Sequence, residues 1–304
     1  MAPQLNTPLA EGTLLENYRI ERLLASGGFS FVYLGYDEND VPVAIKEYLP
    51  STLPLRSEHN LSIRLGAADL AKYRYGLRCF FEEGRALARL QHPNVVRVLS
   101  FFRANDTVYL VMRYERGRSL QEHIRGRSAP IDEVWLRATF AQLLNGLREV
   151  HTNKLLHLDI KPANVYLRDD DSPILIDFGA ARQTLSAEGM KLPPTYTPGY
   201  ASPEHHFGRE HLGPWSDIYS VGATVYACLA AAAPQPADQR LKGDRLVPAR
   251  RQWAGGYSAT LLDIVDWCLR LDHLERPQSV FALQKALLGE KEPERRRAPR
   301  RAKR

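Results

Sequence analysis

The chain has 304 residues, of which 44% are hydrophobic and 25% are charged, a composition typical of globular proteins. This length is enough for one large domain or for two lobes that each bury a core. Residues 291–304 contain eight basic and two acidic side chains, which account for the whole formal net charge of +6. The charge therefore belongs to the C-terminal segment, and it does not indicate that the folded body binds nucleic acid.

The cysteines and the hydropathy pattern exclude several classes of protein. Cys79, Cys228 and Cys268 lie far apart without paired spacing, which argues against a disulfide framework and against a zinc site. No apolar run approaches the length of a membrane span, and no signal-peptide pattern opens the chain. We therefore expect a cytoplasmic protein without a transmembrane segment.

The N-terminal part of the chain has mostly strand patterns. Residues 1–15 show no periodicity and are expected to form a flexible leader. Residues 47–79, after the strand predicted at 41–47, form a long connection of mixed character. Residues 80–92 have a helical period that ends before a proline. Strands are predicted at 18–23, 31–36, 41–47, 95–102 and 107–112, a small-residue turn at 25–30, and, within the long connection, a short strand at 61–65 and a helix at 67–75.

The C-terminal part is mostly helical from Ser119 onward. A strand-rich half followed by a helix-rich half predicts an α+β fold with two lobes and a hinge near residues 114–117. The expected divisions are a leader at 1–15, a domain at 16–288 (N-lobe 16–114, C-lobe 117–288) and a disordered basic tail at 289–304. Helices are predicted at 132–152, with Val134 and Ala138 on its apolar face, and at 217–229, 261–271 and 279–288.

Three short motifs occur in a fixed order. They are Val43-Ala44-Ile45-Lys46, then His-Leu-Asp-Ile-Lys-Pro-Ala-Asn at 157–164, then Asp177-Phe178-Gly179. Each motif is weak alone, but together and with these gaps the set resembles that of protein kinases over residues 18–288. The resemblance implies a two-lobed protein kinase-like fold that phosphorylates Ser or Thr residues of proteins, itself included, with ATP.

The resemblance also assigns roles to individual residues. Asp159 would orient the substrate hydroxyl and take its proton, and Lys161 would neutralise charge on the transferring phosphoryl group. Asn164 and Asp177 would hold Mg²⁺, with Mn²⁺ as an alternative. Lys46 would hold the α/β-phosphates. Its partner would be Glu83 and not the neighbouring Glu82. The loop would contribute Leu24, Ala25, Gly27 and Gly28 to ATP binding. Val32 and Ala44 would lie above the adenine and Tyr166 below it, Met112 would be the gatekeeper, and Arg113 and Glu115 would bind through their backbone.

Four more residues are matched to structural or regulatory positions. Lys161, together with Thr197 seven residues before Glu204, resembles Ser/Thr kinases rather than tyrosine kinases. Glu204 would pair with Arg276 as a buried ion pair. Asp217 would support the backbone of the catalytic loop, with a helix N-cap as the alternative role.

The sequence departs from the family pattern in three places. Ala25 and Ser30 replace loop glycines, which restricts φ and bears on nucleotide affinity. Leu158 replaces an Arg that commonly meets a phosphorylated activation loop, so we expect activity without phosphorylation of residues 183–196. The insertion at 47–79, with Ile45–Pro50, resembles a subset of bacterial eukaryotic-like (Hanks-type) Ser/Thr kinases, and it is either an inert elaboration or a regulatory element.

Two other functions stay open from the sequence. A nucleotide-binding pseudokinase scaffold would explain the altered loop and Leu158, and a basic-tailed adaptor would explain residues 291–304. The implied partners are protein substrates with Ser/Thr acceptors and a cognate protein phosphatase. The tail could bind nucleic acid, an anionic membrane or an acidic partner, although a solvated tail without a partner is the commoner case.

Overall fold

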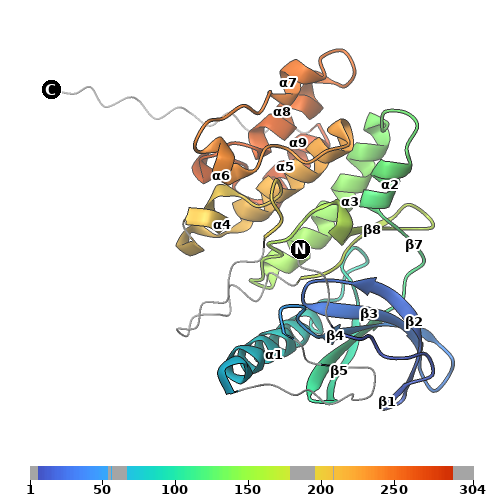
Figure 1. Ribbon diagram of the computed structural model, residues 1–304. Coiled ribbons are helices and arrows are strands. Elements are labelled where there is room, and N and C mark those ends of the chain that lie inside the picture. Colours follow the sequence, from blue (N-terminus) through green and yellow to red (C-terminus); the bar gives the residue numbers. More distant parts are fainter. Residues whose placement is uncertain (1–5, 54–55, 57–66, 179–195, 208, 290–304) are drawn as a thin grey trace.

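The computed structural model describes residues 6–53, 56, 67–178, 196–207 and 209–289. They form two lobes: an N-lobe built on a curled sheet with one long helix, and a helical C-lobe (Figure 1). The two-lobed α+β architecture predicted from the sequence is therefore confirmed. None of the helices in the described ranges combines the length and the hydrophobicity needed to span a bilayer.

The N-lobe sheet is antiparallel, with six strands in the order β1-β2-β3-β4-β6-β5. The alternation seen in the sequence places Tyr33, Ile45 and Val111 in the core, each fully buried. Lys46 lies in the middle of the sheet, opposite Val32 on one side and Leu110 on the other. The strands are β1 (Leu14–Leu15), β2 (Tyr18–Ser26), β3 (Ser30–Tyr36), β4 (Pro42–Tyr48), β5 (Val98–Ala104) and β6 (Thr107–Arg113).

A single helix, α1 (Ala67–Leu87), packs against this sheet, where the sequence predicted two separate helices at 67–75 and 80–92. Gly76 lies between these two predicted segments, where α1 packs against Tyr48 of β4. A Cβ at Gly76 would overlap the hydroxyl of Tyr48. Packing thus outweighs the low helix propensity of glycine. The strand expected at 61–65 lies outside the described residues.

The first described residues also differ from the prediction. Residues 6–15 pack on the N-lobe instead of forming a loose leader, and Leu9 and Leu15 are buried. The backbone N–H of Leu9 donates to the Tyr33 hydroxyl at 3.1 Å. The segment is too short for a periodic pattern, which is why the sequence did not reveal it.

The C-lobe is organised around α5 (Pro214–Ala230), which is buried along most of its length. Polar N-caps begin several of its helices: Ser119 forms a capping box with Glu122, and Asp132 caps the helix that follows. The other C-lobe elements are β7 (Gly117–Ser119), α2 (Leu120–Gly126), α3 (Glu133–Thr152), the 3₁₀ turn η1 (Pro162–Asn164), β8 (Val165–Arg168), β9 (Pro173–Leu175), α4 (Pro203–Phe207), η3 (Arg209–His211), α6 (Ala237–Arg240), α7 (Ala249–Gln252), α8 (Ala259–Cys268), η4 (His273–Glu275) and α9 (Val280–Leu287).

The buried face of α3 is not the one that the sequence indicated at its start. Val134 is 75% exposed, and Ala138 is exposed as well. The buried stripe instead begins at Leu136 and continues through Phe140 at the helical spacing.

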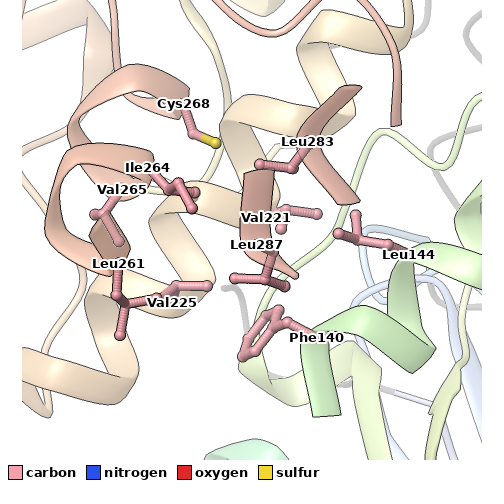
Figure 2. Close-up of a pocket in the computed structure, with 11 residues that line it drawn as sticks. Phe140, Leu144, Val221, Val225, Leu261, Ile264, Val265, Cys268, Leu283 and Leu287 are labelled. Carbon is pink, nitrogen blue, oxygen red and sulfur yellow. The ribbon is translucent and has the colours of Figure 1, made fainter. Parts of the chain in front are cut away.

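An apolar cavity of about 20 Å³ lies where α3, α5, α8 and α9 meet. Figure 2 shows its lining, with Phe140 and Leu144 on one side and Ile264 and Val265 on the other. Gly222 of α5 allows α8 to approach, because a Cβ there would overlap Cβ of Cys268. The close contact of α5 with α8 at Gly222 and Cys268 therefore borders the cavity itself.

The segment after α1 is bonded to the C-lobe. The Asn94 amide nitrogen donates to the Pro173 carbonyl at 2.7 Å, and Leu175 N–H donates to the Asn94 carbonyl at 2.9 Å. Nearby, Arg168 of β8 donates to both carboxylate oxygens of Glu115, at 3.0 and 3.3 Å. These contacts set how β4 and α1 sit above the C-lobe residues that complete the candidate site.

Candidate active site

The backbone of the loop at 157–164 is held by Asp217 of α5. The Asp217 carboxylate accepts hydrogen bonds from the backbone N–H groups of His157 at 2.9 Å and Leu158 at 2.7 Å. It also contacts Nε2 of His151 at 2.7 Å. Leu158 has a φ of 61°, an unusual value for a leucine. The helix N-cap alternative for Asp217 is wrong, because α5 begins at Pro214 and Asp217 lies inside its first turn.

Three polar side chains, those of Lys161, Thr197 and Asn164, bond to the side chain of Asp159. Lys161 Nζ donates to Asp159 Oδ2 at 2.7 Å and to the Thr197 hydroxyl at 2.8 Å. That hydroxyl donates in turn to Asp159 Oδ1 at 3.1 Å. Asn164 Nδ2 donates to Asp159 Oδ2 at 2.9 Å and to its backbone carbonyl. Both carboxylate oxygens are thus oriented by partners that the sequence singled out.

Lys46 joins the N-lobe to Asp177 of the C-lobe. Its Nζ donates to Asp177 Oδ1 at 2.6 Å, across 131 positions of sequence. The lysine is 6% exposed, and its Nζ lies 5.6 Å from the centre of the Phe80 ring on α1. Asp177 has a φ of 60°, a left-handed conformation that is uncommon for a non-glycine residue. The next residue, Phe178, is buried with its ring 4.3 Å from that of His157.

The two candidate partners of Lys46 on α1 are Glu82 and Glu83. Glu83 is buried on α1 at 2% exposure, three residues after Phe80. Glu82 is more exposed and contacts Arg85 at 3.7 Å on the outer side of the helix. Burial therefore favours Glu83 over Glu82, and the Lys46–Glu83 pair stays a prediction.

The residues expected to contact the adenine lie on neighbouring strands. Ala44 of β4 is opposite Met112 of β6, and both are half-buried, as are Val32 and Tyr166. Arg113 follows Met112 on β6, and its backbone N–H donates to the Arg97 carbonyl at 2.9 Å. Arg113 is exposed, Leu24 is half-buried like the others, and the side chain of Glu115 is turned toward Arg168. Their roles toward a nucleotide stay predictions.

The two replaced loop glycines occupy strand positions. Ala25 pairs with Val32 at the end of β2, and Ser30 is the first residue of β3. Neither residue has a positive φ. Alanine and serine therefore fit these positions without backbone strain, and only residues 27–29 form the turn between the strands.

Glu204 and Arg276 form the ion pair that the sequence predicts. Arg276 donates from Nη1 to Glu204 Oε1 at 2.7 Å and from Nη2 to Oε2 at 3.1 Å, and both side chains are buried. The Ser216 hydroxyl donates to the same carboxylate at 2.8 Å. Burial tends to raise the pKa of Glu204, but the hydrogen bonds and charge of Arg276 outweigh it and lower that pKa.

The sequence missed a second buried ion pair, next to Lys46. Glu47 is fully buried and accepts from Arg56 Nη1 at 2.9 Å, with a further bond from Nη2. The hydroxyls of Tyr33 and Tyr109 also donate to it, at 2.8 and 2.6 Å. Burial, followed by the charge of Glu47, raises the pKa of both tyrosines. A Glu–Arg pair nine residues apart across a loop has no sequence signature that could have predicted it.

The donor set at the site fits a divalent cation held together with phosphates. Ile176 N–H donates to the Asn164 carbonyl at 3.0 Å. Because Asp177 is the residue after Ile176, this backbone bond holds Asp177 near Asn164. Both residues carry side-chain oxygens, the ligands that Mg²⁺ prefers. In the described parts of the chain no three His, Cys, Asp or Glu side chains gather in a metal-binding group. A cation here would depend on one carboxylate, one amide oxygen and the phosphates of a nucleotide.

A two-lobed fold with this arrangement of Lys46, Asp159, Asn164 and Asp177 is the one expected of a nucleotide-dependent phosphotransferase. The protein kinase domain profile matches residues 18–288, and the chain belongs to the protein kinase family. This family uses ATP with a divalent metal ion.

The relatives place the chain among bacterial kinases. It is 30% identical to the serine/threonine-protein kinase pkn2 of Myxococcus xanthus over 89% of this chain and 32% of that protein. It is 31% identical to serine/threonine-protein kinase C of a Synechocystis strain over 93% of this chain and 51% of that protein. The chain thus spans only about a third to a half of these relatives.

Among solved structures, the apo form of PpkA-294 superposes with a TM-score of 0.82 at 31% identity, covering 92% of this chain and 99% of that one. The resemblance to bacterial eukaryotic-like Ser/Thr kinases that was drawn from the motifs is confirmed.

Proposed function

We propose that this protein transfers the γ-phosphoryl group of ATP to Ser or Thr hydroxyls of proteins, including its own. The observation that carries the proposal is the hydrogen-bonded group of Asp159, Lys161, Asn164 and Thr197. It fixes a carboxylate and an ammonium group side by side, one for the incoming hydroxyl and one for the phosphoryl group.

In the proposed reaction the acceptor hydroxyl oxygen attacks the γ-phosphorus. A new oxygen–phosphorus bond forms, the bond from the γ-phosphorus to the β–γ bridging oxygen breaks, and ADP leaves. Asp159 takes the hydroxyl proton, and Lys161 stabilises the charge on the phosphoryl oxygens. Lys46 holds the α/β-phosphates. Asn164 and Asp177 would hold Mg²⁺, or Mn²⁺ as the alternative, which would supply further charge neutralisation.

The pseudokinase scaffold is the weaker candidate. It rested on the altered loop and on Leu158, but Ala25 and Ser30 occupy strand positions that accept these residues. The five polar residues of the phosphoryl-transfer site are all present and hydrogen-bonded, namely Lys46, Asp159, Lys161, Asn164 and Asp177.

The decisive test is autophosphorylation with labelled ATP, comparing wild type with Asp159→Ala and mapping phosphosites by mass spectrometry. We expect label on Ser or Thr that disappears in Asp159→Ala but persists in Asp169→Ala, a matched control at an exposed aspartate. If no variant takes up label while ATP still raises the melting temperature, the scaffold function replaces the kinase function.

Several finer expectations accompany the proposal. Three expectations stay predictions: the domain divisions at 16–288 and 289–304, a cytoplasmic localisation and a cognate phosphatase. The localisation is supported by the three cysteines, which are free thiols buried in the folded body. The tail lies outside the described residues. Binding of an anionic partner by residues 291–304 would be tested by deleting them and measuring salt-dependent retention on DNA, on anionic vesicles and on acidic peptides.

A further inference from the structure

The chain immediately after β4 is bonded to the turn between β2 and β3. Leu49 N–H donates to the Phe29 carbonyl and Ser51 N–H donates to the Gly28 carbonyl, both at 2.8 Å. These two bonds continue the β3–β4 ladder, whose last pair is Ser30 and Tyr48, past the ends of the strands. We call residues 49–53 together with Arg56 the brace, and residues 27–29 the phosphate loop.

We propose that the brace positions the phosphate loop over the nucleotide and thereby sets the affinity for ATP. This inference rests on the proposed kinase function, because it assigns to the phosphate loop a contact with the phosphates of ATP. It gives a role to the first part of the 47–79 insertion, for which an inert elaboration was the alternative.

The brace is itself fixed at its far side by Asn6. The Asn6 amide nitrogen donates to the carbonyls of Pro50 at 3.2 Å and Leu53 at 3.0 Å, and its oxygen accepts from Arg56 N–H at 3.1 Å. Asn6 is 5% exposed, so these bonds are shielded from water. Residues near the start of the chain therefore hold the brace in one conformation.

The Arg56 side chain ties the brace to the strand of Lys46. It pairs with Glu47, and the two side chains are 1% and 0% exposed. Because Glu47 follows Lys46 on β4, their side chains leave opposite faces of the strand. Tyr33 and Tyr109 on the two flanking strands bond to the same carboxylate. One buried cluster thus anchors the brace, and through it the phosphate loop, to the strand that carries Lys46.

The composition of the loop explains why such a brace would matter. A glycine-rich loop is mobile and loses conformational entropy when it closes on a ligand. Here Ala25 and Ser30 belong to paired strands and the carbonyls of residues 28 and 29 are already bonded, so the loop is ordered before the nucleotide arrives. Preorganisation of this kind increases affinity by lowering the entropic cost of binding.

Ser51→Pro tests the inference with one substitution. Leu53 N–H donates to the Pro50 carbonyl at 3.2 Å, so residues 50–53 form a turn with Ser51 at its second position. Ser51 does not have a positive φ, and proline is favoured at this position of common turns. The substitution therefore suits the turn and removes the N–H that bonds Gly28.

Glu38→Pro is the matched control. The β3–β4 turn has the same form, since Asp40 N–H donates to the Asp37 carbonyl at 3.1 Å and Glu38 occupies the second position. Glu38 is exposed and does not have a positive φ. The control thus places the same residue in the same kind of turn of the same sheet, away from the phosphate loop.

The readouts are the Kd for a fluorescent ATP analogue and, with peptide substrate, KM for ATP and kcat. We expect Ser51→Pro to raise Kd and KM about fivefold, the worth of one ordinary hydrogen bond, with little change in kcat. Glu38→Pro should match wild type. Asn6→Ala, which loosens the brace without touching the loop, should weaken binding in the same direction, and it decides the question if Ser51→Pro does not fold.

Unchanged nucleotide affinity in the folded brace variants would overturn the inference, as would an equal loss in Glu38→Pro. A loss confined to kcat, or to the melting temperature without nucleotide, would also contradict it, because it would mean that the brace serves stability alone. Direct nucleotide binding needs no phosphoryl transfer, so the brace could stand if the wild type binds ATP yet fails to phosphorylate.

Discussion

The buried carboxylate of Asp217 accepts a hydrogen bond from the backbone N–H of Leu158 at 2.7 Å. The bond holds Leu158 in a left-handed conformation that costs about 1–3 kcal/mol for a residue of this kind. This conformation directs the chain so that Asp159, the next residue, reaches Lys161 and Thr197. A residue in the first turn of α5 therefore acts on the reaction through the backbone of the catalytic loop.

Asp217→Asn should separate this positioning role from nucleotide binding. An amide oxygen can replace only one of the two carboxylate oxygens, so one of the N–H groups of His157 and Leu158 would face an NH₂ group. We expect the free energy of unfolding to fall by about 1–3 kcal/mol and kcat to fall at least tenfold, with KM for ATP nearly unchanged. Urea denaturation and steady-state kinetics measure these quantities.

The exposed Asp263 of α8 provides the control for that experiment, because Asp263→Asn removes a charge but no buried acceptor. It should behave as wild type. Wild-type kcat in a folded Asp217→Asn protein would show that the catalytic loop keeps its conformation without this carboxylate.

The Glu204–Arg276 pair predicts a pH-dependent contribution to stability. Because the pKa of Glu204 is lowered in the folded state, its stabilisation is complete above its unfolded value of about 4.5 and is lost as pH falls through the folded value. Glu204→Gln leaves Arg276 buried without a counter-charge. We expect it to lower the free energy of unfolding by about 3–5 kcal/mol at pH 7.

Below pH 4.5 the Glu204 carboxyl group is protonated in the unfolded state, while the folded state keeps it ionised down to its lowered pKa. The stabilisation by the ion pair therefore diminishes as pH falls, and the difference between wild type and Glu204→Gln should shrink. Urea denaturation at pH 7, 5 and 4 would follow it. The exposed Glu210, changed to Gln, should show no such trend. A difference of constant size at every pH would argue that the pair is not what stabilises this contact.

The motif residues could be predicted from sequence because their chemistry depends on local spacing. Asp159, Lys161 and Asn164 lie within six positions, and the fold brings them to Thr197 and, separately, Lys46 to Asp177. Spacing alone cannot give these long-range contacts. The family resemblance placed the residues in one site, but it assigned Glu83 rather than Asp177 as the partner of Lys46, and it did not predict the bond between Lys161 and Thr197.

The features that the sequence did not predict are those decided by packing. The sequence predicted two helices, at 67–75 and 80–92, and only the packing of Gly76 against Tyr48 shows why one helix continues through this glycine. Asn6 looked like part of a loose segment, but it bonds to residues 44 to 50 positions later. Glu47 and Arg56 form no motif, and their pairing depends on a loop that folds back over the sheet.

Leu158 predicts that activity does not depend on phosphorylation of the activation segment. Its side chain is buried and apolar where many kinases place an arginine, so a phosphate on residues 183–196 would lack that counter-charge. The combined substitution of Thr184, Ser186 and Thr195 by Ala, three positions outside the described residues, should leave most of the kinase activity toward a peptide.

The comparison requires wild type treated with phosphatase as a second sample, which should also stay active. Near-total loss of activity in the triple variant, restored by Asp at one of the three positions, would show that another cation takes the place of the missing arginine.

The cavity in the C-lobe bundle predicts a stabilising substitution. Val225 lines the cavity, so Val225→Ile would place one more methylene group in empty space. We expect the free energy of unfolding to rise by about 0.5–1 kcal/mol, since a buried methylene is worth about 0.8 kcal/mol. Val280 is equally apolar and 3% exposed but does not line the cavity. Val280→Ile should therefore be neutral or destabilising, and thermal unfolding of the two variants tests the difference.

Thr197 is the residue whose hydroxyl completes the polar group at Asp159. It accepts from Lys161 at 2.8 Å and donates to Asp159 at 3.1 Å, so it restrains both charged groups at once. Thr197→Val keeps the shape of the side chain and removes the hydroxyl. Hydrogen bonds to charged groups are worth about 1.5–3 kcal/mol, so we expect kcat to fall roughly 10- to 100-fold while KM for ATP changes little.

Thr197→Ser restores the hydroxyl and should recover most of kcat, which distinguishes the hydrogen bonds from the packing of the methyl group. Single-turnover kinetics at saturating ATP would measure the chemical step for all three proteins. Equal rates in the valine and serine variants would mean that Lys161 and Asp159 hold their positions without the hydroxyl. The pairing of Lys161 with Asp159 at 2.7 Å would then have to be sufficient for catalysis by itself.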